Sequence, residues 1–217
     1  MKHISTALRA TAIGAAAVAS LGALVAPAHA AGETVANIVG NELQVVGSAN
    51  ADHIDVVGDQ PGFTRVTNNK GVKAGNGCTQ ISNVSANCSN QFISQIRLSG
   101  GAGDDILHPD TGFFTIVLGG DGNDTIRNRG TGQARLNGNA GDDVITGELV
   151  DQLFGQEGND RLTNGIFLRG GAGNDILRGL SGNDTLIGDD GFDTLDGGEG
   201  FDDLCLTGES NTGCEAF

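Results

Sequence analysis

The chain has 217 residues, with 27 acidic and 12 basic side chains, a formal net charge of −15 and 37 glycines. This charge repels nucleic acid and anionic membranes and attracts cations, so we expect no nucleic-acid partner. Beyond residues 1–30 no stretch is long and apolar enough to span a bilayer, so we expect no insertion into a membrane. Glycine-rich acidic chains also occur as flexible linkers, and that alternative has to be judged on the pattern of aliphatic residues.

Residues 1–30 have the order of a secretory signal peptide. Lys2 and Arg9 precede a small, apolar run that ends in Ala28-His29-Ala30, an A-x-A cleavage pattern. An uncleaved membrane anchor is the alternative, but the run is short and rich in alanine. We therefore predict a secreted, extracellular protein whose mature chain begins at Ala31 and carries ten basic against 27 acidic residues.

Residues 31–99 are predicted to be a β-rich N-terminal region that caps the rest of the chain. Short alternating runs such as TVANIVG and FISQIRLSG are separated by glycine, asparagine and the turn sequence DQPG. The run GSANADHIDV, from Gly47, looks like a degenerate copy of the repeat that starts at Gly100, with Asp52 as its acid and Ile54 as its aliphatic residue. We favour a coil or cap without metal there, and a metal-binding turn is the alternative.

The four cysteines form two local pairs, Cys78 with Cys88 and Cys205 with Cys214. An even number of cysteines in an exported chain favours disulfide bonds within these pairs. Metal-thiolate binding is the weaker alternative, because neither pair has C-x-x-C spacing and no histidine is close in sequence.

Residues 100–205 contain eight segments that follow the pattern G-G-x-G-x-D-x-U-x, in which U is a large aliphatic residue. The acids at the sixth position are Asp105, Asp124, Asp143, Asp160, Asp175, Asp184, Asp193 and Asp202. The aliphatic residues at the eighth position are Leu107, Ile126, Ile145, Leu162, Leu177, Leu186, Leu195 and Leu204. A flexible linker has no reason to keep both positions in every copy.

Each segment combines a glycine-rich turn with a short alternating strand, so two segments make a coil of about 18 residues with the aliphatic column inside. Steps of 19, 19, 17, 15 and 18 residues place Asp105, Asp124, Asp143, Asp160, Asp175 and Asp193 on one edge. Asp184 and Asp202 then fall on the opposite edge, and the two shortest steps leave the register around Asp160 and Asp175 open. Carboxylates stacked at about 4.8 Å repel one another unless a cation lies between them, and Ca²⁺ accepts such oxygen ligands.

This pattern resembles the hemolysin-type calcium-binding repeat, the RTX nonapeptide of secreted bacterial proteins. The resemblance implies an all-β fold, a right-handed parallel β-roll or β-solenoid, with several Ca²⁺ ions between successive turns. It implies carboxylate ligands from the eight aspartates and carbonyl ligands from turn glycines. Those glycines are Gly101, Gly103, Gly120, Gly122, Gly171, Gly173, Gly198 and Gly200. Segments between the first five copies lack the acidic motif, so calcium is doubtful on their edge.

Residues 206–217 are expected to form a C-terminal cap closed by the second cysteine pair, because stacked repeats need ends that cover the last coil. Phe192 and Phe201 replace the Asn or Asp found at the fifth position of the first six copies. Each is expected to cover an exposed end of the stack, with an aromatic binding platform as the alternative.

The sequence predicts a non-catalytic protein. Residues 31–217 contain two histidines, His53 and His108, and have neither the H-E-x-x-H of zinc proteases nor the G-x-S-x-G of hydrolases. We therefore predict a secreted calcium-binding β-roll that folds when calcium binds. An extracellular adhesion or matrix module with a protein or polysaccharide partner is the first alternative, and a carbohydrate-active enzyme on a β-helix is the second.

Overall fold

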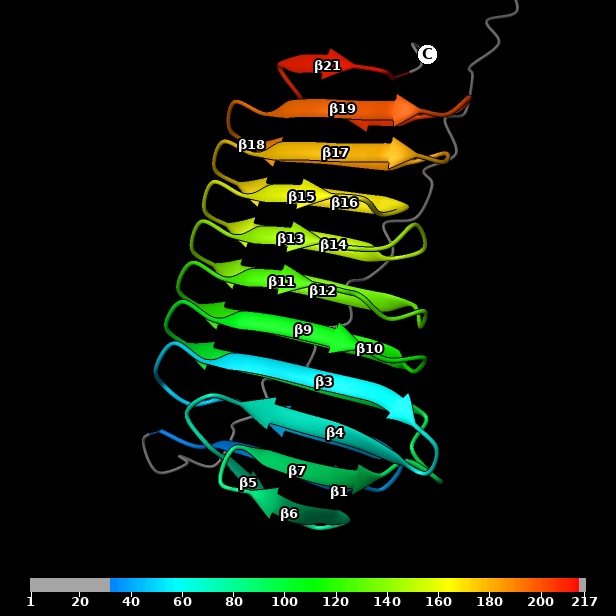
Figure 1. Ribbon diagram of the computed structural model, residues 1–217. Helices are drawn as coiled ribbons and strands as arrows, with labels where there is room; N and C mark the ends of the chain where they lie inside the picture. Colours follow the sequence, from blue (N-terminus) through cyan, green and yellow to red (C-terminus); the bar gives the residue numbers. More distant parts are fainter. Residues whose placement is uncertain (1–31, 215–217) are drawn as a thin grey trace, which may run out of the picture.

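The computed structural model describes residues 32–214, and all regular structure in that range is β-strand. The strands form two long sheets that face each other along the whole stack (Figure 1). The predicted signal peptide, residues 1–30, lies outside the described residues, as do Ala31 and residues 215–217. Within residues 32–214 no helix is long and apolar enough to cross a membrane.

One sheet has ten strands, in the spatial order β20-β18-β16-β14-β12-β10-β8-β2-β1-β5. In chain order these strands are β1 Thr34–Val39, β2 Glu42–Val46, β5 Val72–Ala74, β8 Gln95–Ala102, β10 Phe114–Asp121, β12 Ala134–Ala140, β14 Gln152–Glu157, β16 Phe167–Ala172, β18 Thr185–Asp190 and β20 Leu204–Leu206.

The other sheet has eleven strands, in the order β21-β19-β17-β15-β13-β11-β9-β3-β4-β7-β6. They are β3 His53–Gln60, β4 Phe63–Asn68, β6 Cys78–Ser82, β7 Ser85–Ser89, β9 Ile106–Asp110, β11 Thr125–Arg127, β13 Val144–Thr146, β15 Arg161–Thr163, β17 Ile176–Ser181, β19 Thr194–Glu199 and β21 Ser210–Thr212.

From β8 to β21 the chain alternates between the two sheets, and every strand pairs in parallel with the strand one coil away. This is the parallel β-roll that the repeat pattern predicted, and it is confirmed. The pairing follows from the repeat itself, because a turn and a short strand every nine or so residues bring each strand back above the strand of the previous coil.

The N-terminal region closes one end of the stack. β2 and β3 pair in parallel with β8 and β9, so they form a coil that continues the roll before residue 100. β4, β7 and β6 then turn back as antiparallel strands, and a disulfide joins Cys78 to Cys88 across the β6–β7 pair. A second disulfide joins Cys205 to Cys214 at the other end, so both predicted bridges are confirmed.

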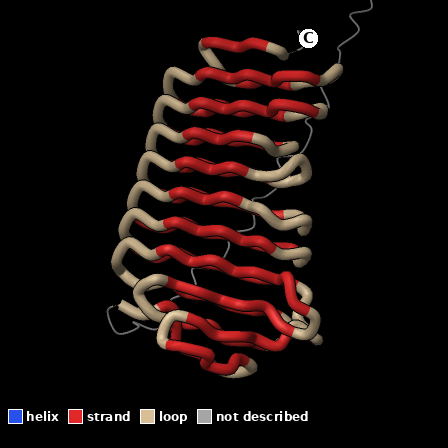
Figure 2. The backbone as a smooth tube through the Cα atoms, viewed as in Figure 1, coloured by secondary structure: helices blue, strands red, loops and turns tan. Residues whose placement is uncertain are grey.

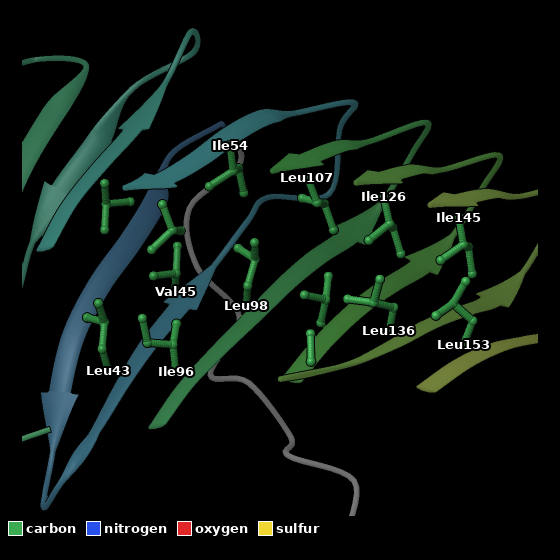
Figure 3. Close-up of a cluster of buried hydrophobic side chains, with 14 of the residues drawn as sticks. Leu43, Val45, Ile54, Ile96, Leu98, Leu107, Ile126, Leu136, Ile145 and Leu153 are labelled. Carbon is green, nitrogen blue, oxygen red and sulfur yellow. The ribbon is translucent and has the colours of Figure 1, made fainter. Parts of the chain in front are cut away.

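The core is a column of aliphatic side chains between the two sheets, seen in Figure 3 for the N-terminal half. Seven of the eight aliphatic repeat positions are fully buried: Leu107, Ile126, Ile145, Leu162, Leu177, Leu186 and Leu195. Burying a side chain of this size contributes about 1.5–3 kcal/mol.

Leu204, the last predicted core residue, is only half-buried, which corrects the expectation for this position. The turn between β17 and β18 has three residues, whereas the turn between β19 and β20 has four, Gly200 to Asp203. The extra residue shifts the pattern by one, so Cys205 pairs with Leu186 and packs against the core in place of Leu204.

The two edges of the roll differ. We call the turns that lead from the ten-stranded to the eleven-stranded sheet the Gly-Asp edge; its turns are 103–105, 122–124, 141–143, 158–160, 173–175 and 191–193. The turns leading back form the variable edge: 111–113, 128–133, 147–151, 164–166, 182–184 and 200–203. Figure 2 shows the first as an even column of turns, while those of the second differ in size.

Candidate metal centre: two edges of stacked turns

The Gly-Asp edge carries a column of buried aspartates. Its members are Asp105, Asp124, Asp143, Asp160, Asp175 and Asp193, and each is almost completely inaccessible to solvent. These are the six residues that the step lengths assigned to one edge. A column of buried acids is unusual, because an ionised carboxylate that leaves water needs a hydrogen-bond donor or a cation to compensate.

Backbone amides compensate one oxygen of each aspartate. The N–H of Asp124 donates to Oδ1 of Asp143 at 2.7 Å, and the N–H of Asp143 donates to Oδ1 of Asp160 at 2.9 Å. The N–H of Asp160 donates to Oδ1 of Asp175 at 2.7 Å. The ladder continues through the two shortest coils, so the 17- and 15-residue steps do not change the register of this edge. The residues are lost on the other side of the coil, where the chain becomes shorter between the paired positions Arg127, Thr146 and Thr163 and the paired positions Arg135, Gln152 and Phe167.

The ladder extends beyond the repeats at both ends. The N–H of Asp52 donates to Oδ1 of Asp105 at 2.6 Å, and the N–H of Asp193 donates to Oε2 of Glu209 at 2.6 Å. A second, outer ladder runs through the fifth positions, where for example the N–H of Asp142 donates to Oδ1 of Asn123. Hydrogen bonds therefore hold successive turns in line.

The other carboxylate oxygen, Oδ2, is buried and has no hydrogen-bond partner in the described chain. This holds for Asp105, Asp124, Asp143, Asp160, Asp175, Asp184 and Asp193. A buried, unsatisfied acceptor costs about 1–3 kcal/mol, and more when it is charged. Six of these oxygens lie in regular positions along the Gly-Asp edge, and that of Asp184 lies at the variable edge. The regular set indicates that the Gly-Asp edge is built for a positively charged occupant.

The first glycine of each repeat marks the place where these oxygens converge with backbone carbonyls. A Cβ on Gly119 would lie 2.1 Å from Oδ2 of Asp124 and 2.6 Å from the carbonyl oxygen of Gly138 in the next coil. At Gly170 the corresponding oxygens belong to Asp175, at 2.1 Å, and Gly188, at 2.8 Å. Glycine is required because a side chain would occupy the space where a carboxylate and a carbonyl meet.

Several of the predicted carbonyl ligands also face the next turn. The carbonyl oxygen of Gly101 would lie 1.9 Å from a Cβ on Gly120, and that of Gly103 would lie 2.5 Å from a Cβ on Gly122. In the same way the carbonyl of Gly122 faces Gly141 and that of Gly173 faces Gly191. Gly171 and Gly198 are each one residue before the end of their strand, β16 and β19, and Gly200 begins the variable-edge turn that follows β19.

Burial sets the protonation of the column. It raises the pKa of Asp105, Asp143 and Asp160 to about 7 and that of Asp124, Asp175 and Asp184 to about 6. The amide hydrogen bonds lower the pKa of the residues in the ladder, and neighbouring carboxylates raise it again, as Asp160 does for Asp143. The column is therefore hard to ionise fully at neutral pH unless a cation enters it.

At the variable edge, Asp203 takes the place predicted for Asp202. Asp203 is buried and its Oδ1 accepts from the N–H of Asp184 at 2.8 Å, whereas Asp202 is exposed. The cause is the same four-residue turn that moves Leu204 out of the core. The candidate ligand set at this edge is therefore Asp184 with Asp203, and the expectation for Asp202 is corrected.

Two further buried acids have their oxygens satisfied by hydrogen bonds. Asp151 accepts from Nδ2 of Asn128, the N–H of Ala134 and the N–H of Glu148, all at 2.7 Å. Asp52 accepts from the N–H of Ser48 at 2.6 Å and from Nδ2 of Asn68 at 2.9 Å. Their role is structural. The hydrogen bonds of Asp52 fit the metal-free coil that we favoured for the degenerate repeat. Asp151 lies in a segment without the repeat, so nothing in the sequence predicted that it is buried.

The turns that carry the aspartate column match a known family of repeats. A family model that describes four copies of the RTX calcium-binding nonapeptide repeat matches five segments of this chain, residues 97–113, 116–127, 130–149, 150–166 and 169–204. Residues 97–204 belong to the RTX calcium-binding repeat family. Neither the curated proteins nor the solved structures that were compared include a match.

The RTX turns of this chain fit calcium. Ca²⁺ takes six to eight oxygen ligands from carboxylates and carbonyls in flexible geometry, and these turns offer both kinds of oxygen at each step. The unpartnered Oδ2 atoms and the glycine spaces in front of them are the features that a hard cation would use. Calcium binding by the RTX roll therefore agrees with the residues present.

Proposed function

We propose that this protein is a secreted, non-catalytic RTX roll whose folding is coupled to calcium binding. The observation that carries the proposal is the set of seven buried Oδ2 atoms without a hydrogen-bond partner. Without a cation these carboxylates destabilise the roll through burial and mutual repulsion. Several Ca²⁺ ions along the Gly-Asp edge, and further ions held by Asp184 and Asp203, would supply the missing interactions and hence folding free energy.

A calcium titration tests the coupling. The chain is freed of metal and titrated with CaCl₂, while circular dichroism measures strand content and small-angle scattering measures the radius of gyration. We expect a gain of strand signal and compaction together at millimolar calcium, with MgCl₂ far less effective because Mg²⁺ requires a smaller octahedral site. A metal-free chain that is already compact, with an unchanged melting temperature, would contradict the proposal.

Export is supported by the order of residues 1–30 and by the two disulfides, which form and persist in oxidising compartments. Expression in a secreting bacterial host tests it. We expect extracellular protein whose N-terminus, by mass spectrometry, is Ala31. Retention of the full chain in the membrane fraction would favour the uncleaved anchor instead.

A binding module is the second candidate, and a groove on the outer face of the ten-stranded sheet favours it. The groove encloses about 490 Å³ and is lined by residues that include Arg135, Asn137, Phe154, Gln156 and Arg169. The guanidinium of Arg135 lies 4.5 Å from the centre of the Phe154 ring, and its buried Nε has no hydrogen-bond partner in the described chain. An aromatic ring, amide groups and a guanidinium are groups that suit contact with a polysaccharide.

Calorimetry with a soluble polyuronide, in saturating calcium, tests this candidate. Arg135→Ala and Phe154→Ala should each weaken binding at least about tenfold if these groups contact the sugar. Arg161→Ala is the matched control, because it removes one exposed arginine from the opposite sheet. Equal binding of the polyuronide by all three variants would exclude the groove as the binding site. Cleavage of the polyuronide would favour an enzyme.

A further inference from the structure

The two histidines of residues 31–217 meet on the outer face of the eleven-stranded sheet. His53 and His108 are 55 residues apart in sequence, yet their ring centres are 5.4 Å apart. Asp55 lies between them: its Oδ1 is 3.0 Å from Nδ1 of His108, and its Oδ2 is 3.6 Å from Nε2 of His53. Two imidazoles and one carboxylate therefore face one another on the outer face of the sheet.

The fold fixes this arrangement. β3 and β9 pair in parallel with Asp55 opposite His108. His53 precedes Asp55 by two residues, so both side chains leave the same face of β3. Because all three residues lie on strands of the sheet, their backbone positions are set before any ligand arrives, which is the preorganisation that a metal site requires.

The distances are close to those of a metal centre. In a tetrahedral site with metal–ligand bonds of about 2.1 Å, ligand atoms are about 3.4 Å apart. The two distances to Asp55 lie on either side of this value, and one ligand atom from each of the three residues lies within 4.8 Å of the others. Small side-chain rotations would complete the geometry without backbone movement.

A His–Asp hydrogen bond alone does not account for the cluster. It explains His108, but the 3.6 Å between His53 and Asp55 is too long for a hydrogen bond. We propose that His53, Asp55 and His108 bind one divalent transition-metal ion of the zinc class, with water at the remaining coordination positions. Imidazole favours such ions, whereas calcium takes oxygen ligands, so this site is chemically distinct from the RTX turns.

The surroundings leave room for an ion to enter. The side chains of His53, Asp55 and His108 are 40%, 35% and 12% exposed. A bound ion would connect β3, in the N-terminal coil, with β9, in the first RTX coil, and would stabilise their junction. The positive charge of Arg129 acts on His108 and opposes binding of the cation.

Zinc titration of the full chain in saturating calcium tests the proposal, because calcium keeps the roll folded and its turns occupied. Calorimetry should show one Zn²⁺ per chain bound with micromolar or tighter affinity, and Co²⁺ should give the absorption of a tetrahedral centre. His53→Ala, His108→Ala and Asp55→Asn should each weaken zinc binding at least about tenfold. Arg129→Gln should strengthen it.

Asp196→Asn is the matched control, because Asp196 lies on β19 of the same sheet, far along the stack, and should leave zinc affinity unchanged. Circular dichroism in calcium confirms that each variant is folded, and His3 and His29 are present in every sample. Equal zinc binding by the wild type and a His53→Ala/His108→Ala double variant would overturn the proposal. So would the absence of any saturable zinc binding.

Discussion

At the scale of single residues, the RTX turn joins two requirements in one place: an aspartate whose Oδ2 is buried, and a glycine that leaves space for it. The first glycine of the repeat is therefore needed because it leaves space for the carboxylate, since the backbone of Gly119 does not have a positive φ. This differs from the usual reason for glycine in a turn, which is backbone conformation. The two reasons can be separated by substitution.

We expect Gly119→Ala to destabilise the calcium-loaded roll by about 1–3 kcal/mol, since its Cβ would overlap Oδ2 of Asp124 and the carbonyl of Gly138. Urea unfolding in saturating calcium measures the loss. Gly112→Ala is the control: its Cβ would meet only Oγ1 of Thr131, at 3.7 Å, and Gly112 also lacks a positive φ. Similar unfolding midpoints for both variants would show that the space is not required.

Asp143→Asn should have opposite effects with and without calcium. The asparagine oxygen can still accept from the N–H of Asp124, but the variant loses a buried charge and a cation ligand. The metal-free chain should therefore gain strand signal, while the calcium midpoint should rise roughly tenfold. Asp142→Asn, at the exposed neighbouring position, is the control and should change neither quantity strongly. If Asp143→Asn stabilised or destabilised the metal-free and the calcium-loaded protein equally, Asp143 would not be a calcium ligand.

At the scale of the turn column, the raised pKa values make the stability of the metal-free roll depend on pH. The folded-state pKa values of about 6–7 lie above the ordinary aspartate value of about 3.9. A raised carboxyl pKa contributes stability that is fully present below pH 4 and is lost as the pH rises through 6 to 7. The metal-free roll should therefore be more ordered at pH 5 than at pH 7.5.

Circular dichroism and thermal unfolding of metal-free protein at the two pH values measure this effect. Protons and calcium compete for the same oxygens, so the calcium midpoint should also be higher at pH 5. An Asp143→Asn/Asp160→Asn variant should show a smaller pH dependence, because it removes two groups whose pKa is about 7. Greater order of the metal-free wild type at pH 7.5 would refute the expectation.

The turns of the Gly-Asp edge also show how much of the fold can be predicted from the sequence. The nine-residue period predicted both sheets, both edges and the aspartates of the Gly-Asp edge, because each repeat contains its own turn, strand and core residue. The prediction failed at Asp202 and Leu204. Two consecutive acids, Asp202 and Asp203, leave the register open there, and the length of the turn determines which of them is buried. The nine-residue period could not find the metal cluster, since nothing in the sequence indicates that His108 lies opposite Asp55; only the pairing of β3 with β9 does.

At the scale of the whole molecule, the roll is a one-dimensional stack in which each coil pairs only with its neighbours. Its two ends are covered differently. Antiparallel strands and Cys78–Cys88 close the N-terminal end, while the C-terminal end has two short strands and Cys205–Cys214. Phe192 and Phe201 are 78% and 90% exposed, so they cover little of the stack, contrary to the expectation that they cover its ends.

Because the stack is one-dimensional, loss of an end disulfide should act locally. In a Cys205→Ser/Cys214→Ser variant, the chain that forms β20 and β21 loses a bridge across nine residues, which contributes about 2–3 kcal/mol. Hydrogen exchange in saturating calcium should become faster in β18 to β21 and remain unchanged in β10 to β13. A Cys78→Ser/Cys88→Ser variant should instead affect β4 to β7. If either variant accelerated exchange equally along the whole roll, the coils would unfold as one unit and the one-dimensional description would be wrong.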